Sequence, residues 1–289
     1  MIPNSIDELA VALEGERYQA DRALLVALHL SLQMGKPLLL EGEPGVGKTE
    51  IAKVLASITG EPLIRLQCYE GLDVNHALYE WDYARQMLAI RLMEATGDTG
   101  DVHDVMSREY LRPRPLLEAI EAAKGGRRPV LLIDEVDRAD EEFEAFLLEL
   151  LSDFQITIPE IGTIAAEDRP IVVVTSNRTR EIHDALKRRC IYHWIDYPDH
   201  EREVAIVSAK VPDLGEALAG QLAEAMQRLR TLDLFKPPGV AETIDWATAL
   251  QVLGADALTP EVVDETLGVV VKYQDDLDAI RHAGVDALL

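Results

Sequence analysis

The stretch that decides the fold is Gly42-Glu43-Pro44-Gly45-Val46-Gly47-Lys48-Thr49. It has the form G-x-x-x-x-G-K-T, follows the apolar run 37–40 and precedes the helix-like stretch 50–56. A strand, a glycine-rich turn and a helix in this order form a phosphate-binding loop. The glycines allow a tight turn whose N–H groups point at phosphate oxygens, and the helix N-terminus adds partial positive charge. The stretch therefore predicts a site for a nucleoside triphosphate.

Two side chains of this loop are expected to act on the nucleotide directly. Lys48 should reach the β- and γ-phosphates, and the hydroxyl of Thr49 should bind Mg²⁺. We assign to the nucleotide site the whole loop and the residue after it: Gly42, Glu43, Pro44, Gly45, Val46, Gly47, Lys48, Thr49 and Glu50.

Composition restricts the class of protein. The chain has 289 residues, of which 48% are hydrophobic and 28% charged, as in ordinary soluble globular proteins. Its formal net charge of −24 opposes general affinity for nucleic acid, because such binding needs a basic face. The densest basic stretch is Lys187-Arg188-Arg189. The acid excess can serve solubility, which we favour, or face a basic partner.

Cysteine content and the N-terminus bear on the compartment. Cys68 and Cys190 are the two cysteines, and their separation indicates buried reduced thiols rather than a zinc knuckle or a disulfide framework. The first residues lack the form of a signal peptide, and no apolar run reaches the ~20 residues needed to cross a bilayer. We expect a cytoplasmic protein without a membrane span.

Apolar periodicity predicts an α/β domain followed by a helical one. Strands are expected at 37–40, 62–66, 129–133, 171–175 and 191–195. Helices are expected at 5–13, 20–34, 50–56, 116–124 and 141–151. This alternation predicts a doubly wound parallel sheet. Beyond Pro198 the pattern is helical, with breaks near 236–239 and at Pro260, so we place one domain at 1–197 and the other at 198–289.

Two segments depart from this alternation. The stretch 70–114 is irregular and polar, with one helical piece at 83–93. It contains an acidic loop whose spacing fits neither an EF-hand nor a zinc site, so we expect a solvated loop. The acidic and histidine residues of that loop are Asp98, Asp101, His103 and Asp104. The segment 154–164 is expected to form a hairpin.

Polar residues follow the predicted buried strands. Asp134 and Glu135 end one strand, where Asp134 can hold the Mg²⁺ shell and Glu135 can orient the attacking water. Asn177 follows the next strand, where it can contact the γ-phosphate or that water, although Asn also favours helix caps and turns. Arg188 and Arg189 precede the last strand and can stabilise charge on a phosphoryl group, although the pair by itself favours a solvated surface.

This order of motifs resembles that of AAA+ ATPases. The stretches 132–139 (LIDEVDRA) and 236–246 (KPPGVAETIDW) resemble the MoxR branch, especially its CoxD-type members. The resemblance covers essentially the whole chain. It implies a P-loop NTPase fold with a small all-α lid, and an ATPase that forms ADP and phosphate.

The resemblance also implies roles for single residues. The loop matches Walker A, Asp134 with Glu135 matches Walker B, and Asn177 matches sensor 1. One of Arg188 and Arg189 matches an arginine finger given to the next subunit; we prefer Arg189, which precedes a cysteine as in the S-R-C box of clamp loaders. Tyr18 lies where related proteins pack the adenine, and the hairpin at 154–164 is either a pore or substrate loop or an ordinary connection.

At the level of the whole protein, the resemblance implies a homo-oligomeric, often hexameric ring. Family members act as chaperones with a partner that carries a von Willebrand factor A domain. They remodel or mature metal-containing enzymes, and CoxD-type members are associated with molybdenum hydroxylases of the CO dehydrogenase type. No nucleic-acid partner is expected.

One position departs from the pattern. Where many AAA+ proteins have the sensor 2 arginine, this chain has Ala241, which cannot contact a phosphate; Lys236 is a possible substitute. Two other functions remain open. One is an AAA+ nucleic-acid motor or loader, for example the ATPase subunit of a restriction or helicase complex. The other is a nucleotide-gated scaffold that hardly turns over.

Overall fold

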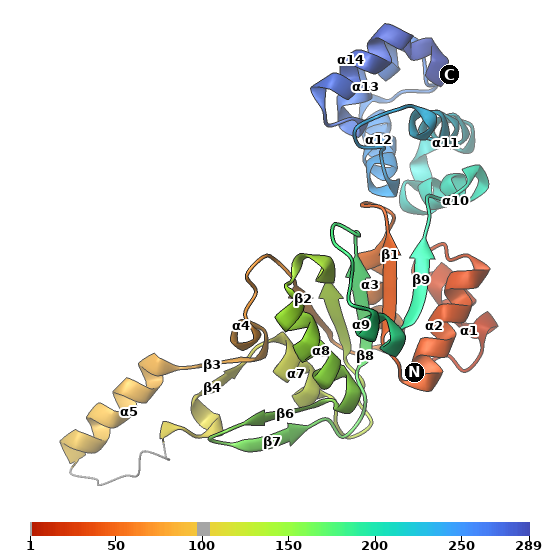
Figure 1. The fold of residues 1–289 in the computed structure, drawn as a ribbon. Coiled ribbons are helices and arrows are strands. Elements are labelled where there is room, and N and C mark those ends of the chain that lie inside the picture. Colours follow the sequence, from red (N-terminus) through yellow and green to blue (C-terminus); the bar gives the residue numbers. More distant parts are fainter. Residues whose placement is uncertain (1, 97–104) are drawn as a thin grey trace. The chain divides into compact units, whose positions relative to one another are not determined.

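The computed structural model describes residues 2–96 and 105–289, which divide into two compact units (Figure 1). The sheet unit comprises Val26–Glu41 and Leu55–His193. The helical unit comprises Pro3–Leu25, Gly42–Val54 and Trp194–Leu289. The phosphate-loop segment thus packs with the C-terminal helices although it lies early in the sequence. The predicted domain boundary near Pro198 divides the chain by sequence position, whereas the two units are defined by packing and combine separate segments. The boundary stays a prediction.

A five-stranded parallel sheet forms the centre of the sheet unit. Its strands are β1 (Leu38–Gly42), β2 (Leu63–Gln67), β5 (Val130–Asp134), β8 (Ile171–Ser176) and β9 (Ile191–Ile195), in the order β2-β5-β8-β1-β9. Every residue of β1, β5 and β8 is buried, as the continuous apolar runs predicted. The pairs Glu41↔Ser176 and Ile133↔Val174 bring the carboxyl ends of these three strands to one edge. The predicted fold class is confirmed.

Helices of this unit bury one apolar side against the sheet. They include α2 (Arg22–Met34), α7 (Pro115–Ala122), α8 (Glu141–Asp153) and α9 (Asp184–Arg189). The side chain of Asp140 caps α8 by accepting from the Phe143 N–H at 2.8 Å. Phe143 and Leu147 are buried in one core with Ile133 of β5. The helical period of these residues therefore holds α8 over the strand that carries the two acids.

The stretch 70–114 is more ordered than its sequence indicated. Besides the predicted helix, now α5 (Tyr83–Thr96), it forms α4 (Val74–Leu78), the 3₁₀ turn η1 (Arg108–Tyr110), and strands β3 (Tyr79–Trp81) and β4 (Leu111–Pro113). The strands were missed because each has only three residues and no clear alternation. Ion pairs join this segment: Arg85–Glu109, Arg112–Asp82 and Arg114–Glu80. The acidic loop with Asp98, Asp101, His103 and Asp104 lies outside the described residues.

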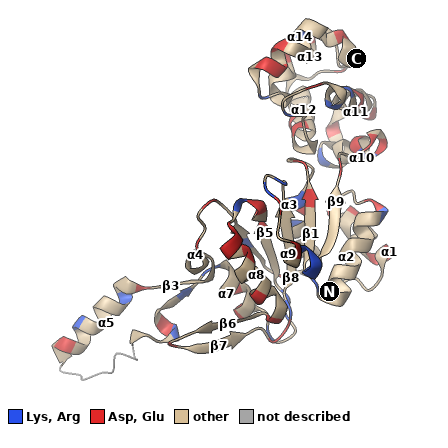
Figure 2. Cartoon of the chain, in the orientation of Figure 1, with Lys and Arg blue, Asp and Glu red and all other residues tan. Residues whose placement is uncertain are grey.

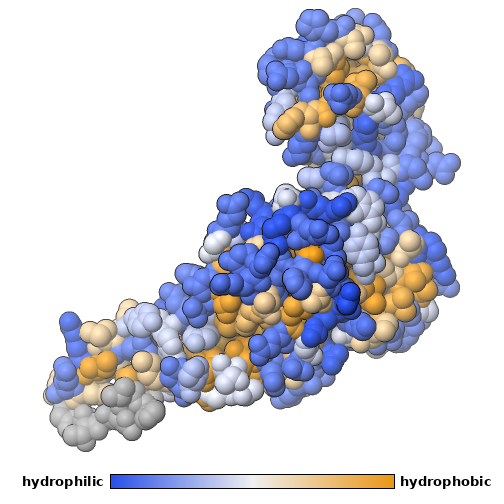
Figure 3. All heavy atoms as spheres, in the orientation of Figure 1, coloured by the Kyte–Doolittle hydropathy of each residue, from blue (hydrophilic) through white to orange (hydrophobic). Residues whose placement is uncertain are grey.

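Helix α5 is exposed on nearly all sides. Its buried side chain is Gln86, which donates to the Val105 carbonyl at 2.8 Å. Large apolar residues of α5, among them Tyr83, Leu88 and Leu92, are more than half exposed, and orange atoms mark this surface in Figure 3. Because the large apolar side chains of α5 do not pack on one face, the sequence of this helix shows only a weak helical period of apolar residues.

The predicted hairpin is present. Strands β6 (Gln155–Ile158) and β7 (Gly162–Ala165) pair antiparallel, and the hydroxyls of Thr157 and Thr163 lie 3.0 Å apart across them. Whether the hairpin serves as a pore or substrate loop stays a prediction.

The helical unit has its own core. Its helices are α1 (Ile6–Gly15), α10 (His200–Lys210), α11 (Glu216–Thr231), α12 (Val240–Leu253), α13 (Pro260–Val270) and α14 (Gln274–Ala283), together with the part of α3 (Lys48–Thr59) up to Val54. It also contains the 3₁₀ turns η3 (Pro212–Leu214) and η4 (Val285–Leu288). The predicted break near 236–239 falls between α11 and α12, and Pro260 is the first residue of α13. Trp246, Leu222 and Leu267 are fully buried together.

A buried polar network also joins the helices of this unit. The carboxylate of Glu203 accepts from both terminal nitrogens of Arg230 at 2.7 Å and from the Thr243 hydroxyl at 2.7 Å. Because all these groups are buried, the network fixes α10 against α11 and α12.

Both cysteines are buried, as predicted. Burial raises the pKa of Cys68 and of Cys190 to about 12, so both thiols stay protonated at neutral pH. Every helix in the described part of the chain is too short or too polar to cross a membrane.

Candidate nucleotide site

The phosphate loop leaves the sheet edge directly after β1. A Cβ at Gly42 would lie 2.3 Å from the carbonyl oxygen of Ile195, so only glycine fits there. Helix α3 begins at Lys48, and the ammonium of Lys48 donates to the carbonyls of Gly42 and Glu43, at 2.7 Å each. The lysine is buried, which places its charge inside the turn of the loop. This geometry is that of an anion cradle at a helix N-terminus.

The N-terminus of α12 contacts this loop through backbone atoms. The Ala241 N–H donates to the Gly45 carbonyl at 3.1 Å. A Cβ at Gly239 would lie 2.7 Å from the carbonyl oxygen of Pro44. Lys236 is exposed, and its backbone N–H donates to Asp276 at 3.4 Å. In the structure Ala241 thus contacts the loop itself, where a sensor 2 arginine would reach a phosphate.

Tyr18 and Glu50 also lie beside the loop segment. The ring of Tyr18 is 7% exposed, and its edge lies 4.0 Å from the Cβ position at Gly47. Its burial raises the pKa of the Tyr18 phenol far above the ordinary value, so it stays neutral. Burial acts to raise the pKa of Glu50, but ion pairs with Lys53 at 2.9 Å and Lys210 at 3.5 Å outweigh it and hold that pKa low.

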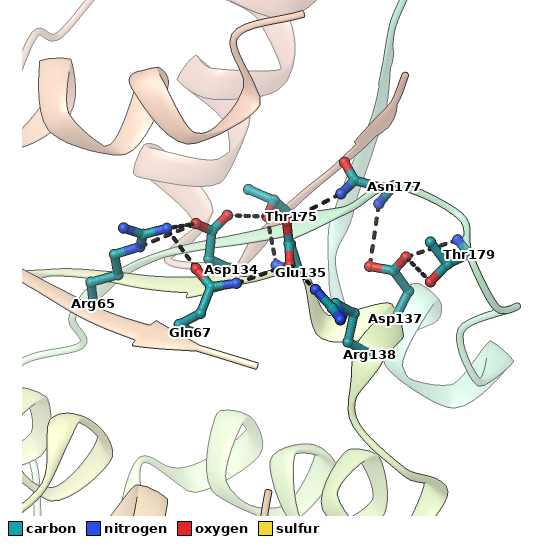
Figure 4. A network of polar contacts seen from close by, with 9 residues as sticks. All are labelled: Arg65, Gln67, Asp134, Glu135, Asp137, Arg138, Thr175, Asn177 and Thr179. Carbon is teal, nitrogen blue, oxygen red and sulfur yellow. Dashed lines mark hydrogen bonds and ion pairs between the residues drawn. The ribbon is translucent and has the colours of Figure 1, made fainter. Parts of the chain in front are cut away.

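The second half of the predicted site lies at the end of β5 (Figure 4). Asp134 is 3% exposed, and each of its carboxylate oxygens has a partner. The Thr175 hydroxyl donates to Oδ1 at 2.6 Å, and the Arg65 guanidinium donates to Oδ2 at 2.5 and 3.1 Å. The charge of this buried acid is therefore compensated within the sheet unit.

Glu135 is held from both sides. Gln67 Nε2 donates to Oε2 at 3.0 Å, Asn177 Nδ2 donates to Oε1 at 3.4 Å, and Arg138 forms an ion pair with Oε2 at 3.4 Å. Its backbone is left-handed, with φ 55° and ψ 51°, a strained conformation for a non-glycine residue. The Glu135 N–H donates to the Thr175 hydroxyl at 2.9 Å, which helps to fix that turn.

Asn177 lies within hydrogen-bond distance of Glu135 because Asp137 fixes the loop that carries Asn177. Buried Asp137 accepts from the Asn177 N–H at 3.2 Å, and from the N–H and hydroxyl of Thr179 at 2.8 and 2.7 Å. The Arg180 guanidinium donates to the Ala139 carbonyl at 2.6 Å and pairs with Glu144. The structure thus brings together Asp134, Glu135 and Asn177, as the common sheet edge predicted.

A cavity of about 570 Å³ opens beside these residues. Glu135 and Asn177 line it together with Arg138 and Arg180. Its walls carry both signs of charge, so it can hold water next to the Glu135 carboxylate. That is the arrangement required of a residue that orients a water molecule.

Arg188 and Arg189 lie in the last turn of α9, which is blue in Figure 2. Both side chains are exposed. Within residues 2–96 and 105–289 neither guanidinium forms a hydrogen bond or an ion pair. The preceding residue, Lys187, lies 3.9 Å from the buried carboxylate of Glu41. The arginines therefore point to solvent in one chain and are not part of the Glu135 cluster.

Several residues of the cluster were not found from the sequence: Arg65, Gln67, Asp137, Arg138 and Thr175. For Arg65 and Gln67 a signal existed, since polar residues alternate with apolar ones along β2 and so share one face. The other contacts depend on which strands are neighbours, which periodicity does not give.

The donor atoms suit Mg²⁺ in the way that nucleotide sites bind it. Thr49 in the helical unit offers a hydroxyl and Asp134 in the sheet unit offers a carboxylate, and each is an oxygen ligand of the kind that Mg²⁺ prefers. In the described part of the chain, no cluster of three or more His, Cys, Asp or Glu could hold a metal by itself. The remaining ligands would come from phosphates and water, as is usual for Mg²⁺.

The sequence is similar to two known proteins. Over 48 residues, 17% of the chain, the sequence is 40% identical to midasin of Giardia intestinalis, of which the match spans 1%. It is 22% identical over 282 residues to the uncharacterized protein SH1500 of Staphylococcus haemolyticus, covering 94% of this chain and 98% of that one.

The fold is similar to that of RuvB from Thermotoga maritima. One point variant of RuvB has a TM-score of 0.50 at 20% identity, covering 96% of this chain and 76% of that chain. Residues 37–190, more than half of the chain, match the family described as AAA domain (dynein-related subfamily). The chain therefore belongs to this family of AAA+ proteins.

Proposed function

We propose that this protein binds ATP with Mg²⁺ and hydrolyses it to ADP and phosphate. The observation that carries the proposal is the placement of Glu135, held by Gln67 at 3.0 Å and Asn177 at 3.4 Å beside a cavity of about 570 Å³. A carboxylate so placed can orient and polarise a water molecule. An amide next to it can hold the water or a phosphate oxygen.

The loop residues have complementary roles in this proposal. The N–H groups of the loop and the ammonium of Lys48 bind the phosphates, and Glu43, Pro44, Val46 and Glu50 shape the turn around them. Thr49 and Asp134 hold Mg²⁺, which when bound neutralises phosphate charge. Tyr18 packs the adenine. Arg188 or Arg189, with Arg189 preferred, acts on the nucleotide of a neighbouring subunit, which fits their exposure and lack of partners in the described chain.

At the level of the assembly, we propose a MoxR-like, CoxD-type chaperone of the cytoplasm. It would form a homo-oligomeric, hexameric ring and act with a von Willebrand factor A domain protein on a client metalloenzyme, such as a molybdenum hydroxylase of the CO dehydrogenase type. The segments 132–139 and 236–246 support this assignment. A von Willebrand-type gene beside hydroxylase genes would support the pathway, whereas a nuclease gene there would contradict it.

The test of hydrolysis is the variant Glu135→Gln. It removes the charge that polarises water but keeps the size of the side chain and its contact to Asn177. We expect ATP binding within about twofold of the parent and turnover reduced by at least about 10²-fold. Binding is measured with a fluorescent nucleotide and turnover by phosphate release.

Glu142→Gln is the matched control, because Glu142 is exposed on the first turn of α8. It should turn over like the parent. If Glu135→Gln also does so, the role of Glu135 is wrong. If the parent binds ATP without turnover, the scaffold function replaces the enzyme.

The nucleic-acid motor is the weaker alternative. A RuvB-like fold at 20% identity shows shared architecture alone, and the net charge of −24 disfavours phosphate backbones. DNA binding that falls steeply with salt, together with DNA-stimulated turnover, would favour it.

A further inference from the structure

Arg65 is the counter-ion of Asp134. Its side chain is 52% exposed, while that of Asp134 is 4% exposed. Both Nε and Nη2 donate to the single oxygen Oδ2, at 3.1 and 2.5 Å. A guanidinium in this position stabilises the charge of a carboxylate that is shielded from water.

The same guanidinium also orients Gln67. Arg65 Nη2 donates to Gln67 Oε1 at 2.5 Å, which leaves Gln67 Nε2 to donate to Glu135 at 3.0 Å (Figure 4). Arg65 and Gln67 are two residues apart on β2, and Gln67 pairs in register with Asp134. One face of the edge strand therefore contacts both acids, through the Arg65–Asp134, Arg65–Gln67 and Gln67–Glu135 hydrogen bonds.

We propose that Arg65 competes with Mg²⁺ for Asp134 and so sets the Mg²⁺ concentration at which the protein binds ATP. This rests on the proposed function, in which Asp134 holds the metal. Two cations cannot both use Oδ2 at close range, because their charges repel each other in a buried site. The ion pair with Arg65 thus lowers the affinity of Asp134 for the metal. In this proposal Arg65 acts through Asp134 and is a positioning residue.

The alternative is that Arg65 only anchors β2 at the edge of the sheet. The two roles differ in what they predict. An anchor affects the stability of the protein equally with and without Mg²⁺. A competing counter-ion affects how much Mg²⁺ is needed and how strongly Mg²⁺ with nucleotide stabilises the protein.

The chain offers a matched control in Arg112. It donates to one oxygen of Asp82 at 2.7 and 3.0 Å, and the side chains are 66% and 5% exposed. This pair has nearly the same geometry and burial as Arg65–Asp134, but it lies in the β3–β4 segment. Arg112→Gln thus removes an equivalent ion pair away from both acids.

The experiment titrates Mg²⁺ against the full-length protein with a fluorescent, slowly hydrolysed ATP analogue. In Arg65→Gln we expect the half-saturating Mg²⁺ concentration to fall about three- to fivefold, which corresponds to the free energy of a half-exposed ion pair. Mg²⁺ with the analogue should also raise the melting temperature more than in the parent. Arg112→Gln should match the parent in both measurements.

An Arg65→Gln protein that needs as much Mg²⁺ as the parent, or more, overturns the proposal. If this variant does not fold, Arg65→Lys replaces it. The lysine keeps the positive charge but lacks the planar set of donors of a guanidinium, so we expect the half-saturating Mg²⁺ concentration to fall about twofold. An unchanged Mg²⁺ concentration in this variant overturns the proposal. A parent without Mg²⁺-dependent binding contradicts the proposed function itself. Mg²⁺-dependent binding in the parent with an unchanged variant contradicts only the role of Arg65.

Discussion

At the scale of single residues, Thr175 connects the two acids of the site. Its hydroxyl donates to Asp134 at 2.6 Å and accepts from the Glu135 N–H at 2.9 Å. One oxygen thus contacts both the carboxylate that we propose to bind Mg²⁺ and the strained turn that carries Glu135. Threonine is therefore required at the end of β8 for its hydroxyl rather than for its β propensity.

Thr175→Val tests this connection with almost no change of shape. The valine removes the buried hydroxyl that donates to Asp134 and accepts from the Glu135 N–H, so we expect a loss of about 1–3 kcal/mol of stability and slower ATP turnover. Urea unfolding and phosphate release measure the two effects. Thr157→Val is the control, because that hydroxyl is exposed on the β6–β7 hairpin; it should change stability by less than about 0.5 kcal/mol. Equal effects of the two variants would contradict the role of Thr175.

The sequence could predict the residues that sit on the strand ends but not those that support them. Asp134, Glu135 and Asn177 each follow an apolar run, and parallel strands end at one edge. Gln67 contacts Glu135 from the neighbouring strand β2, and Asp137 contacts Asn177 from the 3₁₀ turn η2 (Val136–Arg138). Neither the strand order nor this turn leaves a local pattern in the sequence. Non-local pairing is decided by packing of the whole sheet.

At the scale of elements, predictability follows apolar content. The strands β1, β5 and β8 were predicted because they are continuous apolar runs, and the helix α8 was predicted because its buried residues keep a helical period. The short strands β3 and β4 were missed because each has only three residues, too few to show an alternation of apolar and polar side chains. Helix α9 was missed for a related reason: within its six residues, Leu186 supplies the buried contact.

The contact between α12 and the phosphate loop is testable with one methyl group. Gly239→Ala places a Cβ 2.7 Å from the Pro44 carbonyl oxygen. Because that oxygen belongs to the backbone, the loop or the helix must shift. We expect a loss of about 1–3 kcal/mol of stability and weaker ATP binding, because Pro44 belongs to the loop. Thermal unfolding and nucleotide titration give the two values.

Gly220→Ala is the control for this substitution. Gly220 lies inside α11 with nothing within 4 Å of its Cβ position, so alanine should stabilise the protein by about 0.5–1 kcal/mol. If both variants shift stability in the same direction, the α12 contact does not constrain the loop.

At the scale of the whole molecule, the chain has two packing units and a pair of arginines that form no ion pair with any acid in the described residues. The loop segment packs in the helical unit, whereas Asp134 and Glu135 belong to the sheet unit. Arg188 and Arg189 are exposed although the chain carries a net charge of −24. Exposed arginines without an ion pair in the described residues, in so acidic a protein, are expected to serve a neighbouring molecule.

Mixed assemblies test that role. Arg188→Ala with Arg189→Ala should keep ATP binding within about twofold but reduce turnover by at least about 10²-fold, since an arginine finger acts on the transition state. When parent and variant chains are co-expressed in known ratios, turnover per parent chain should change with the ratio, because each site needs a neighbour. The control removes Arg228 and Arg281, which form exposed ion pairs in the helical unit, and changes the net charge equally. Mixtures with the control should keep the parent rate; strictly proportional loss with the Arg188 and Arg189 variant would show that each chain uses only its own residues.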